Sequence, residues 1–381
     1  MNAKTVLLLA LALLAGACGK SPPAADAASA AAGKPGADAG AKTLNVYNWS
    51  DYIAEDTIPD FEKQTGIKVT YDVFDSNEVL EAKLMAGATG YDIVVPSLNF
   101  LGRQIKAGVF LPLDKSKLPN YKNLDPKLMA IIAQLDPGNQ YGIPYMWGTV
   151  GIGYNVKKVK ELLGDKAPVD SWALVFDPAN AAKLKSCGLT MLDSPTDILS
   201  AALKYQGADP NTRDEATIQE AADLVMKVRP YITYFHSSQY INDLANGDVC
   251  VSVGWSGDVF QARNRAQEAK NGVELAYSIP KEGAQMWFDM MAIPKDAKHV
   301  DNALAFLNYL MEPKVIADDS NFIAYANANA AATQYVDPAV RDNPAIYPPP
   351  AVMDKLFLLQ VLPPDLDRVY NRAWTAIKTG R

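Results

Sequence analysis

Short strand-like runs alternate with helix-like segments in the first half of the chain. The runs with the hydrophobic pattern of strands are 44–47, 68–73 and 92–95. The segments with apolar residues at helical spacing are 56–65, 77–85 and 98–107. Ser76 is a typical helix N-cap, and Gly66 is a typical helix end. This β-α-β-α-β order predicts a mostly parallel sheet with helices on both faces.

A second series of elements follows. The pattern predicts strands at 149–154, 249–253, 276–280 and 286–293. It predicts helices at 156–163, 197–206, 215–228, 300–311 and 365–378. Residues 337–350 hold five prolines, which indicates a loop. The roughly 340 residues that follow the N-terminal region exceed the usual size of one hydrophobic core, so we expect two lobes.

The N-terminus has the pattern of an export signal. Lys4 precedes an apolar run that is too short to span a bilayer, so residues 1–17 are predicted to be a signal peptide. Small residues before Cys18 are similar to a bacterial lipoprotein cleavage site, and a plain cleavage site is the alternative. Residues 18–42 are rich in Ala, Gly and Pro, which predicts a flexible tether behind a lipidated Cys18. We expect a periplasmic protein whose membrane contact is limited to that anchor.

Charge and cysteine content narrow the possible functions. The chain has 36 Lys and Arg against 43 Asp and Glu, a net charge of −7. This balance argues against a nucleic-acid partner and is compatible with a cationic ligand. Cys187 and Cys250 remain after the signal, without a C-x-x-C motif. They indicate either one disulfide or two buried thiols.

Motifs of catalysis are scarce in this sequence. It lacks a Gly-x-Ser-x-Gly elbow, a P-loop and a His/Cys cluster with metal-ligand spacing. His236 beside Ser237 and Ser238 leaves a hydrolase as an alternative, although nothing in the pattern provides an oxyanion hole. We therefore expect no catalytic residues, no metal and no cofactor.

Aromatic residues accompany carboxylates in several separate segments. The run YNWSDY at 47–52 follows a predicted strand, and strand ends are where α/β proteins usually bind ligands. Trp255 precedes Asp258, and Trp287 and Asp289 share one face of a predicted strand. Each pair alone also has an interpretation as core packing, or as a helix N-terminus for Asp258.

Together, these pairs suit an organic cation with an apolar middle. Aromatic faces attract positive charge, and carboxylates pair with it. A linear diamine or polyamine carries ammonium groups at its ends and methylene groups between them. Each buried ammonium needs a carboxylate, because an unpaired buried charge is very costly.

Residues 44–378 also resemble the periplasmic polyamine-binding proteins of ABC importers, and the putrescine-binding type most of all. The resemblance rests on YNWSDY at 47–52, YDVFDSNE at 71–78, PYMW at 144–147, SSQYIND at 237–243 and YANAN at 325–329. It implies the type II substrate-binding fold, in which two α/β lobes, each a mostly parallel sheet flanked by helices, enclose the ligand in an interlobe cleft. The implied first lobe is 43–148 and 286–333, and the second is 149–285 and 334–381.

The resemblance implies a polyamine site when it is carried over residue by residue. The implied residues are Trp49, Ser50, Asp51, Tyr52, Ser97, Asp197, Trp255, Asp258, Trp287, Asp289 and Tyr325. Asp258 and Asp289 would face ammonium groups, and the tryptophans and Tyr325 would line the methylene chain. Asp51 has an alternative role as a contact that closes the lobes.

Other positions matched by the resemblance are informative too. Cys187 and Cys250 match a disulfide of the putrescine-binding type. Trp287, Thr196 and Asn99 depart from the residues expected there, which leaves the choice of polyamine open.

The resemblance implies a monomer that captures putrescine or spermidine and delivers it to an inner-membrane ABC permease. One alternative is a polyamine-sensing lipoprotein without a transport role, and another is the hydrolase built on His236. An iron-binding protein of the same two-lobed class is a further alternative, which the tryptophans fit poorly.

Overall fold

The computed structural model describes residues 41–381. The predicted signal peptide, the candidate lipidation site Cys18 and most of the predicted tether lie outside these residues. Among the helices of residues 41–381, none combines the length and the apolar character that a membrane span requires.

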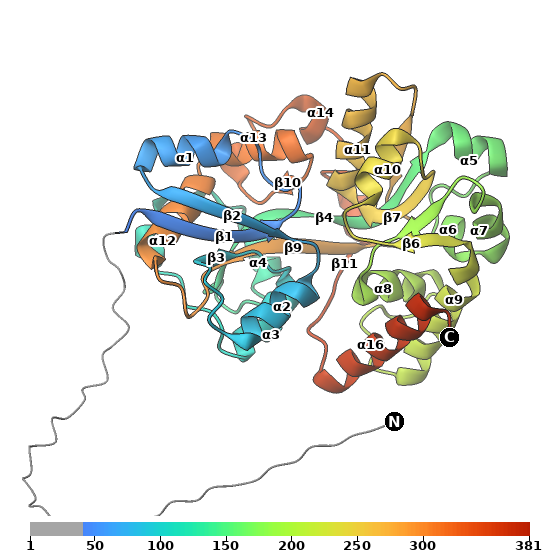
Figure 1. The fold of residues 1–381 in the computed structure, drawn as a ribbon, viewed down its shortest axis with the longest axis horizontal. Coiled ribbons are helices and arrows are strands. Elements are labelled where there is room, and N and C mark those ends of the chain that lie inside the picture. Colours follow the sequence, from blue (N-terminus) through green and yellow to red (C-terminus); the bar gives the residue numbers. More distant parts are fainter. Residues whose placement is uncertain (1–40) are drawn as a thin grey trace, which may run out of the picture. The chain divides into compact units, whose positions relative to one another are not determined.

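The first group of strands is built as the hydrophobic pattern predicts. Its leading elements are β1 (Thr43–Trp49), α1 (Thr57–Thr65), β2 (Lys68–Phe74), α2 (Asn77–Ala86), β3 (Ile93–Val94) and α3 (Leu98–Lys106). β1 pairs in parallel with β2 and with β3. The Ser76 hydroxyl accepts the Val79 N–H at the start of α2, so the predicted N-cap is confirmed. Figure 1 shows α1 on one face of this sheet and α2 and α3 on the other.

One long strand, β4 (Gly142–Asn155), joins this group to a second one. β4 pairs with β9 (Gln285–Ala292) over its first half and with β7 (Val251–Trp255) and β8 (Leu275–Ser278) over its second half. β10 (Ala326–Asn327) pairs with β4, and β11 (Phe357–Leu358) pairs with β9. We call β1, β2, β3, β9, β10, β11 and residues 142–149 the first strand group.

The second strand group contains β5 (Leu189–Met191), β6 (Ile232–Phe235), β7, β8 and residues 150–155 of β4. β5 pairs in parallel with β6 and β7. Pairing is antiparallel along β4 and between β3 and β9. The sheets are therefore mixed rather than mostly parallel, because β4 runs antiparallel to each strand that it pairs with and β9 runs antiparallel to β3.

Helices cover both groups, and each helix predicted from the sequence is present within a few residues of its expected bounds. The remaining helices are α4 (Pro126–Ile132), α5 (Val156–Leu163), α6 (Ala173–Phe176), α7 (Pro178–Leu184), α8 (Pro195–Tyr205), α9 (Glu215–Val228), α10 (Tyr240–Asn246), α11 (Ser256–Ala269), α12 (Val300–Leu310), α13 (Pro313–Ile323), α14 (Pro338–Arg341), α15 (Pro350–Met353) and α16 (Pro364–Thr379). Residues 337–350 are not entirely loop, because Pro338 and Pro350 each occupy the first position of a short helix, where proline is tolerated.

Cys187 and Cys250 form a disulfide with a Cα–Cα distance of 5.5 Å. The predicted disulfide is therefore confirmed, and the alternative of two free thiols is wrong. The bond links the end of α7 to the start of β7 within the second strand group. The lobe boundaries at 148/149, 285/286 and 333/334 stay a prediction.

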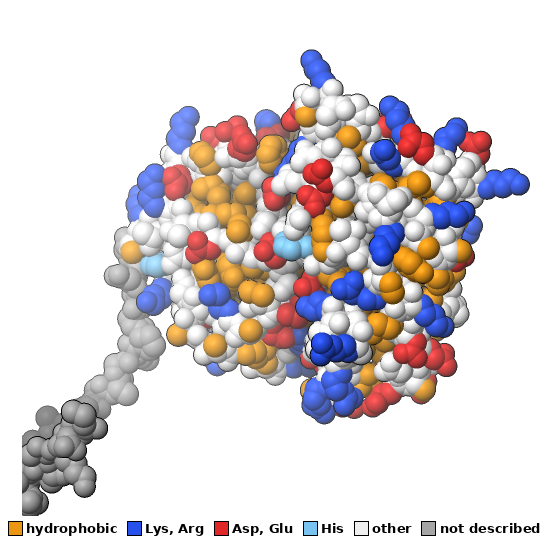
Figure 2. All heavy atoms as spheres, turned by 45° about the vertical axis from the view of Figure 1, so that its right-hand side comes forward, with side chains coloured by type: hydrophobic (Ala, Val, Ile, Leu, Met, Phe, Trp, Pro, Cys, Tyr) orange, Lys and Arg blue, Asp and Glu red, His pale blue; other side chains and the backbone are white. Residues whose placement is uncertain are grey.

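Charge is distributed over the surface rather than separated by sign. Figure 2 shows Lys and Arg side chains interspersed with acidic and uncharged ones on the face that it draws. Charge has its strongest effect in pockets, where water is scarce.

Candidate functional site

A pocket with about 730 Å³ of space that no atom fills lies between the two strand groups. Ten of the eleven predicted site residues line it. They are Trp49, Ser50, Tyr52, Ser97, Asp197, Trp255, Asp258, Trp287, Asp289 and Tyr325. These ten residues come from six separate stretches of sequence that meet at one place.

Strand ends explain how these residues meet. Trp49 ends β1, Ser97 follows β3, and Trp255 ends β7. Since the carboxyl ends of neighbouring parallel strands lie at one edge of a sheet, the loops after them converge on that edge. Trp287 and Asp289 instead come from β9, where they share one face, as predicted.

Aromatic rings form the walls of the pocket. The Trp49 and Trp255 rings meet edge to face with 5.6 Å between centroids, and they come from different strand groups. The Tyr325 ring contacts Trp287 at 5.2 Å and Tyr52 at 5.3 Å. Trp49 Nε1 donates to the Val95 carbonyl at 2.9 Å, which holds the indole in place. The rings present flat apolar faces to whatever occupies the pocket.

Asp258 lies in the first turn of α11 and is 8% exposed. Its carboxylate accepts the Tyr325 hydroxyl at 2.6 Å and the Tyr240 hydroxyl at 2.7 Å. Burial raises the pKa of Asp258 to about 6, and these two hydrogen bonds oppose the rise. A cation beside Asp258 would relieve the cost of that burial.

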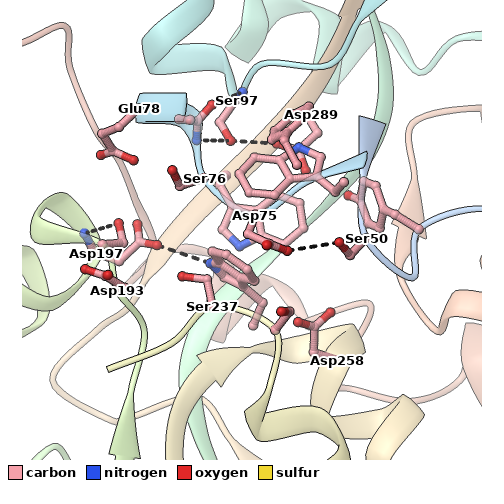
Figure 3. Close-up of a pocket in the computed structure, with 18 of the residues that line it drawn as sticks. Ser50, Asp75, Ser76, Glu78, Ser97, Asp193, Asp197, Ser237, Asp258 and Asp289 are labelled. Carbon is pink, nitrogen blue, oxygen red and sulfur yellow. Dashed lines mark hydrogen bonds between the residues drawn. The ribbon is translucent and has the colours of Figure 1, made fainter. Parts of the chain in front are cut away.

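Asp289 is the second deeply buried acid, at 5% exposure. Ser97 Oγ donates to Asp289 Oδ1 at 2.6 Å, and Asn77 Nδ2 donates to Ser97 Oγ at 3.0 Å (Figure 3). The pKa of Asp289 is raised to about 7, mainly by burial and to a smaller extent by the nearby carboxylates of Asp197 and Asp258. The Ser97 hydrogen bond fixes the direction in which this carboxylate points.

Asp197 occupies the first turn of α8 and is 7% exposed. Trp255 Nε1 donates to its carboxylate at 3.2 Å. Burial raises the pKa of Asp197 to about 6. Figure 3 shows Asp197 on the opposite side of the pocket from Asp258 and Asp289. We call these sides the Asp197 end and the Asp258/Asp289 end.

The sequence reasoning missed three further acids of the pocket, Asp75, Glu78 and Asp193. Burial raises the pKa of Glu78 to about 7. Asp75 and Glu78 belong to the run YDVFDSNE, which carried the resemblance, and they follow a predicted strand. Asp193 follows β5, a three-residue strand that the hydrophobic pattern did not predict.

The lining residues therefore carry six carboxylates, and none of them is Lys, Arg or His. Three buried donors of the lining residues, Trp287 Nε1, Ser237 Oγ and the Tyr52 hydroxyl, have no hydrogen-bonding partner among residues 41–381. The carboxylates and aromatic faces of this pocket favour a cation that has an apolar portion and repel anions.

The structure does not bring Asp51 into the pocket. Its carboxylate pairs with the Arg265 guanidinium of α11 at 2.7 Å, and Asp51 is exposed. The reason lies in the backbone, since Asp51 has a left-handed φ of 54° that turns it away from its neighbours in the run. Asp51 thus joins the loop after β1 to α11.

His236 does not line the pocket. Its Nδ1 accepts the backbone N–H groups of Ser238 at 3.1 Å and Gln239 at 3.0 Å. The imidazole therefore holds the start of the segment that leads into α10, and the hydrolase hypothesis gains no support from it. Within residues 41–381, no three His, Cys, Asp or Glu side chains are grouped so that they could hold a metal ion.

Comparison with known proteins agrees with this geometry. Residues 56–348 match the family described as bacterial extracellular solute-binding protein. The putrescine-binding periplasmic protein PotF of Escherichia coli K12 is 61% identical over 341 residues, which cover 89% of this chain and 92% of PotF. The putrescine-binding periplasmic protein SpuD of Pseudomonas aeruginosa UCBPP-PA14 is 58% identical over 340 residues, 89% of this chain and 93% of SpuD.

A solved structure supports the fold. The spermidine/putrescine ABC transporter substrate-binding protein PotD from Streptococcus pneumoniae has a TM-score of 0.71 and 29% identity, over 89% of this chain and 99% of that one. The predicted two-lobed α/β fold of type II is confirmed, with the sheets mixed as described above. The chain belongs to the family of bacterial extracellular solute-binding proteins.

Proposed function

We propose that this protein captures a polyamine, with putrescine as the first candidate, and delivers it to an ABC permease in the inner membrane. The observation that carries the proposal is the pocket with six carboxylates, no basic side chain and aromatic walls. Relatives that are 61% and 58% identical are named putrescine-binding periplasmic proteins. The family is one of solute-binding proteins, so we infer binding and release without a chemical step.

The chemistry of a diamine matches the pocket. We infer that Asp258 and Asp289 pair with the ammonium group at their end of the pocket and Asp197 with the one at the other end, because all three carboxylates are less than a tenth exposed and no Lys, Arg or His is among the lining residues. The Trp49, Trp255 and Trp287 rings would pack against the methylene chain. Ser50, Tyr52, Ser97 and Tyr325 complete the proposed binding set.

The lobe boundaries predicted above define how the ligand would be enclosed. β4 is the long strand that pairs with both strand groups, and residues 279–284 lead from β8 back to β9. Trp49 contacts Trp255, Tyr325 bonds to Asp258, and Asp51 pairs with Arg265, each across the proposed lobes. These contacts support a closed arrangement, and ligand that touches both lobes would shift the population toward it.

We propose that the protein is periplasmic, held to the membrane by lipid at Cys18, and monomeric. The sequence pattern of residues 1–18 supports export and lipidation. A structural neighbour from Treponema pallidum, with 28% identity and a TM-score of 0.74, is named a lipoprotein. Labelling of cells with a fatty-acid probe, with Cys18→Ser as the control, tests the anchor.

A ligand panel tests the proposal as a whole. The purified protein is titrated with putrescine, cadaverine, spermidine and spermine in a calorimeter, and its thermal unfolding is followed with each. We expect saturable binding of at least putrescine, together with a higher unfolding temperature. Absence of heat and of any thermal shift with all four amines would contradict the proposed function.

A further inference from the structure

A second pocket adjoins the first at the Asp197 end. The two pockets share Asp75, Ser76, Glu78, Asp193 and Ser237. The far side of the second pocket is formed by the C-terminal helix α16, through Asn371, Trp374, Thr375 and Lys378. A ligand that extends beyond the Asp197 end therefore meets α16.

Asp193 stands at the boundary of the two pockets and is bonded to α16. Trp374 Nε1 donates to Asp193 Oδ1 at 2.7 Å, and Lys378 Nζ donates to Asp193 Oδ2 at 3.1 Å. Lys378 is the sole Lys or Arg among the residues that line either of these pockets in the described part of the chain. Its ammonium group thus stands at the edge of an otherwise acidic cavity.

A triamine would bring one more ammonium group than a diamine. If two ammonium groups are paired within the first pocket, the third would reach past Asp197 and would need a carboxylate there. Glu78 and Asp193 are the acids at that end (Figure 3), and Asp193 is already paired with Lys378. The Lys378 ammonium group therefore occupies the carboxylate that the third ammonium group of a triamine would need.

We propose that Lys378 is a specificity-determining residue that disfavours polyamines with a third ammonium group relative to diamines. This inference rests on the proposed polyamine function. Lys378 acts in two ways, because it shares the Asp193 carboxylate and because its own charge repels an approaching ammonium group. Both effects are weaker for a diamine held between Asp197 and the Asp258/Asp289 end, because its ammonium groups lie farther from Lys378, which is partly exposed to solvent that screens its charge.

Lys378 also has a purely structural interpretation. It lies in the last turn of α16, where a cation interacts favourably with the helix carboxyl end. The Lys378 and Asp193 side chains are 42% and 39% exposed, and ion pairs that exposed contribute little to stability. Trp374 remains bonded to Asp193 when the lysine is replaced, so the local structure should persist.

The test compares two ligands across matched variants. Affinities for putrescine and spermidine are measured by calorimetry at low ionic strength for the wild type, Lys378→Met and Lys378→Arg. Lys281→Met is the control, because it also removes one positive charge, from an exposed pair with Asp170 that lines neither pocket.

We expect Lys378→Met to tighten spermidine binding about threefold or more and to change putrescine binding by less than about twofold. Lys378→Arg and Lys281→Met should keep the wild-type ratio of the two affinities. Adding Asp193→Asn to Lys378→Met should remove the gain. An unchanged ratio in Lys378→Met, or an equal change for both ligands, would overturn the inference while leaving the proposed function intact. A wild type that binds neither amine would overturn both.

Discussion

Burial gives the carboxylates of the pocket their chemistry. Asp197, Asp258 and Asp289 are each less than a tenth exposed, and burial raises the pKa of each above its ordinary range near 4. These buried acids are costly to ionise, and a bound ammonium group would lower that cost. The ligand would supply the positive charge that none of the lining residues provides.

Asp289→Asn tests one of these acids directly. The amide keeps the shape and can still accept from Ser97, but it removes the charge that we expect to pair with an ammonium group. Polyamine affinity measured by calorimetry should fall by at least about 1 kcal/mol and at most several. Asp301→Asn, which removes an exposed charge from α12, is the control and should bind like the wild type. Equal affinities for the two variants would place Asp289 outside the site.

The raised pKa values also predict opposite pH dependences for stability and for binding. Between about pH 4 and the pKa values of about 6 to 7, the folded protein holds protons that the unfolded chain has released. These acids therefore make the ligand-free protein more stable as pH falls from 8 to 5.5, whereas affinity for a cation should decrease over the same range.

Thermal unfolding and calorimetry at several pH values check this pair of trends. Asp289→Asn should lose part of the pH dependence of both, because it lacks one of the titrating groups. Affinity that rises on acidification, or a variant with the full wild-type pH dependence, would contradict the role given to these carboxylates.

The sequence identified pocket residues where a local hydrophobic pattern located the strand that holds them. Trp287 and Asp289 are two positions apart on a predicted strand, so the sequence indicated that both side chains project from the same face. Trp49 follows a predicted strand, so the sequence indicated that it lies at a strand end. The direction of the Asp51 side chain could not be inferred, because its left-handed backbone breaks the alternation of the run. Asp193 was missed since three-residue β5 has no detectable period, and its partner Lys378 lies 185 positions away.

At the scale of elements, α11 shows why a strong helix can escape sequence reasoning. Ser256–Ala269 is a 14-residue helix, yet its sequence is polar, opens with Ser-Gly-Asp and lacks a clear apolar stripe. Its N-terminus packs on the Tyr325 ring, and Asp258 and Arg265 both project from it. Tertiary packing, rather than local propensity, accounts for this helix.

Gly257 makes that packing possible. A Cβ atom there would lie 2.4 Å from the nearest Tyr325 ring atoms. Gly257→Ala should therefore destabilise the protein by about 1–3 kcal/mol, although alanine is normally the better helix former. Denaturant unfolding measures this cost, and calorimetry should show weaker polyamine binding because Tyr325 and Asp258 are displaced.

A double variant distinguishes the clash from a general effect on the helix. Tyr325→Leu removes the ring, so the cost of Gly257→Ala should be smaller in the Tyr325→Leu background than in the wild type. If the losses in unfolding free energy from the two changes are additive, contact with the Tyr325 ring is not the reason that residue 257 must be glycine.

At the scale of the whole molecule, an ion pair and an aromatic contact link the two strand groups across the pocket. The Asp51–Arg265 pair and the Trp49–Trp255 contact connect the loop after β1 with the β7–α11 region. The strand and helix order was predictable from hydrophobic pattern, since each element is local. The antiparallel course of β4 and β9 was not, because pairing partners lie more than a hundred residues apart.

Asp51→Asn tests whether this ion pair holds the closed arrangement. The pair is partly exposed, so its loss should weaken polyamine binding by about 0.2–1 kcal/mol, mainly through faster dissociation. Stopped-flow measurement of ligand release checks this. Arg341→Met, which breaks an exposed pair with Asp342 away from the pocket, should leave release unchanged. A wild-type dissociation rate for Asp51→Asn would assign the pair no part in closure.

The central claim is that the pocket recognises a chain with a positive charge at each end. The most direct test is a calorimetric titration of the purified protein with putrescine and, in parallel, with the uncharged diol of the same carbon chain. The account predicts saturable binding of one putrescine per protein and no measurable binding of the diol, because the buried carboxylates pair with ammonium groups. Equal binding of the two compounds, or binding of neither, would contradict it.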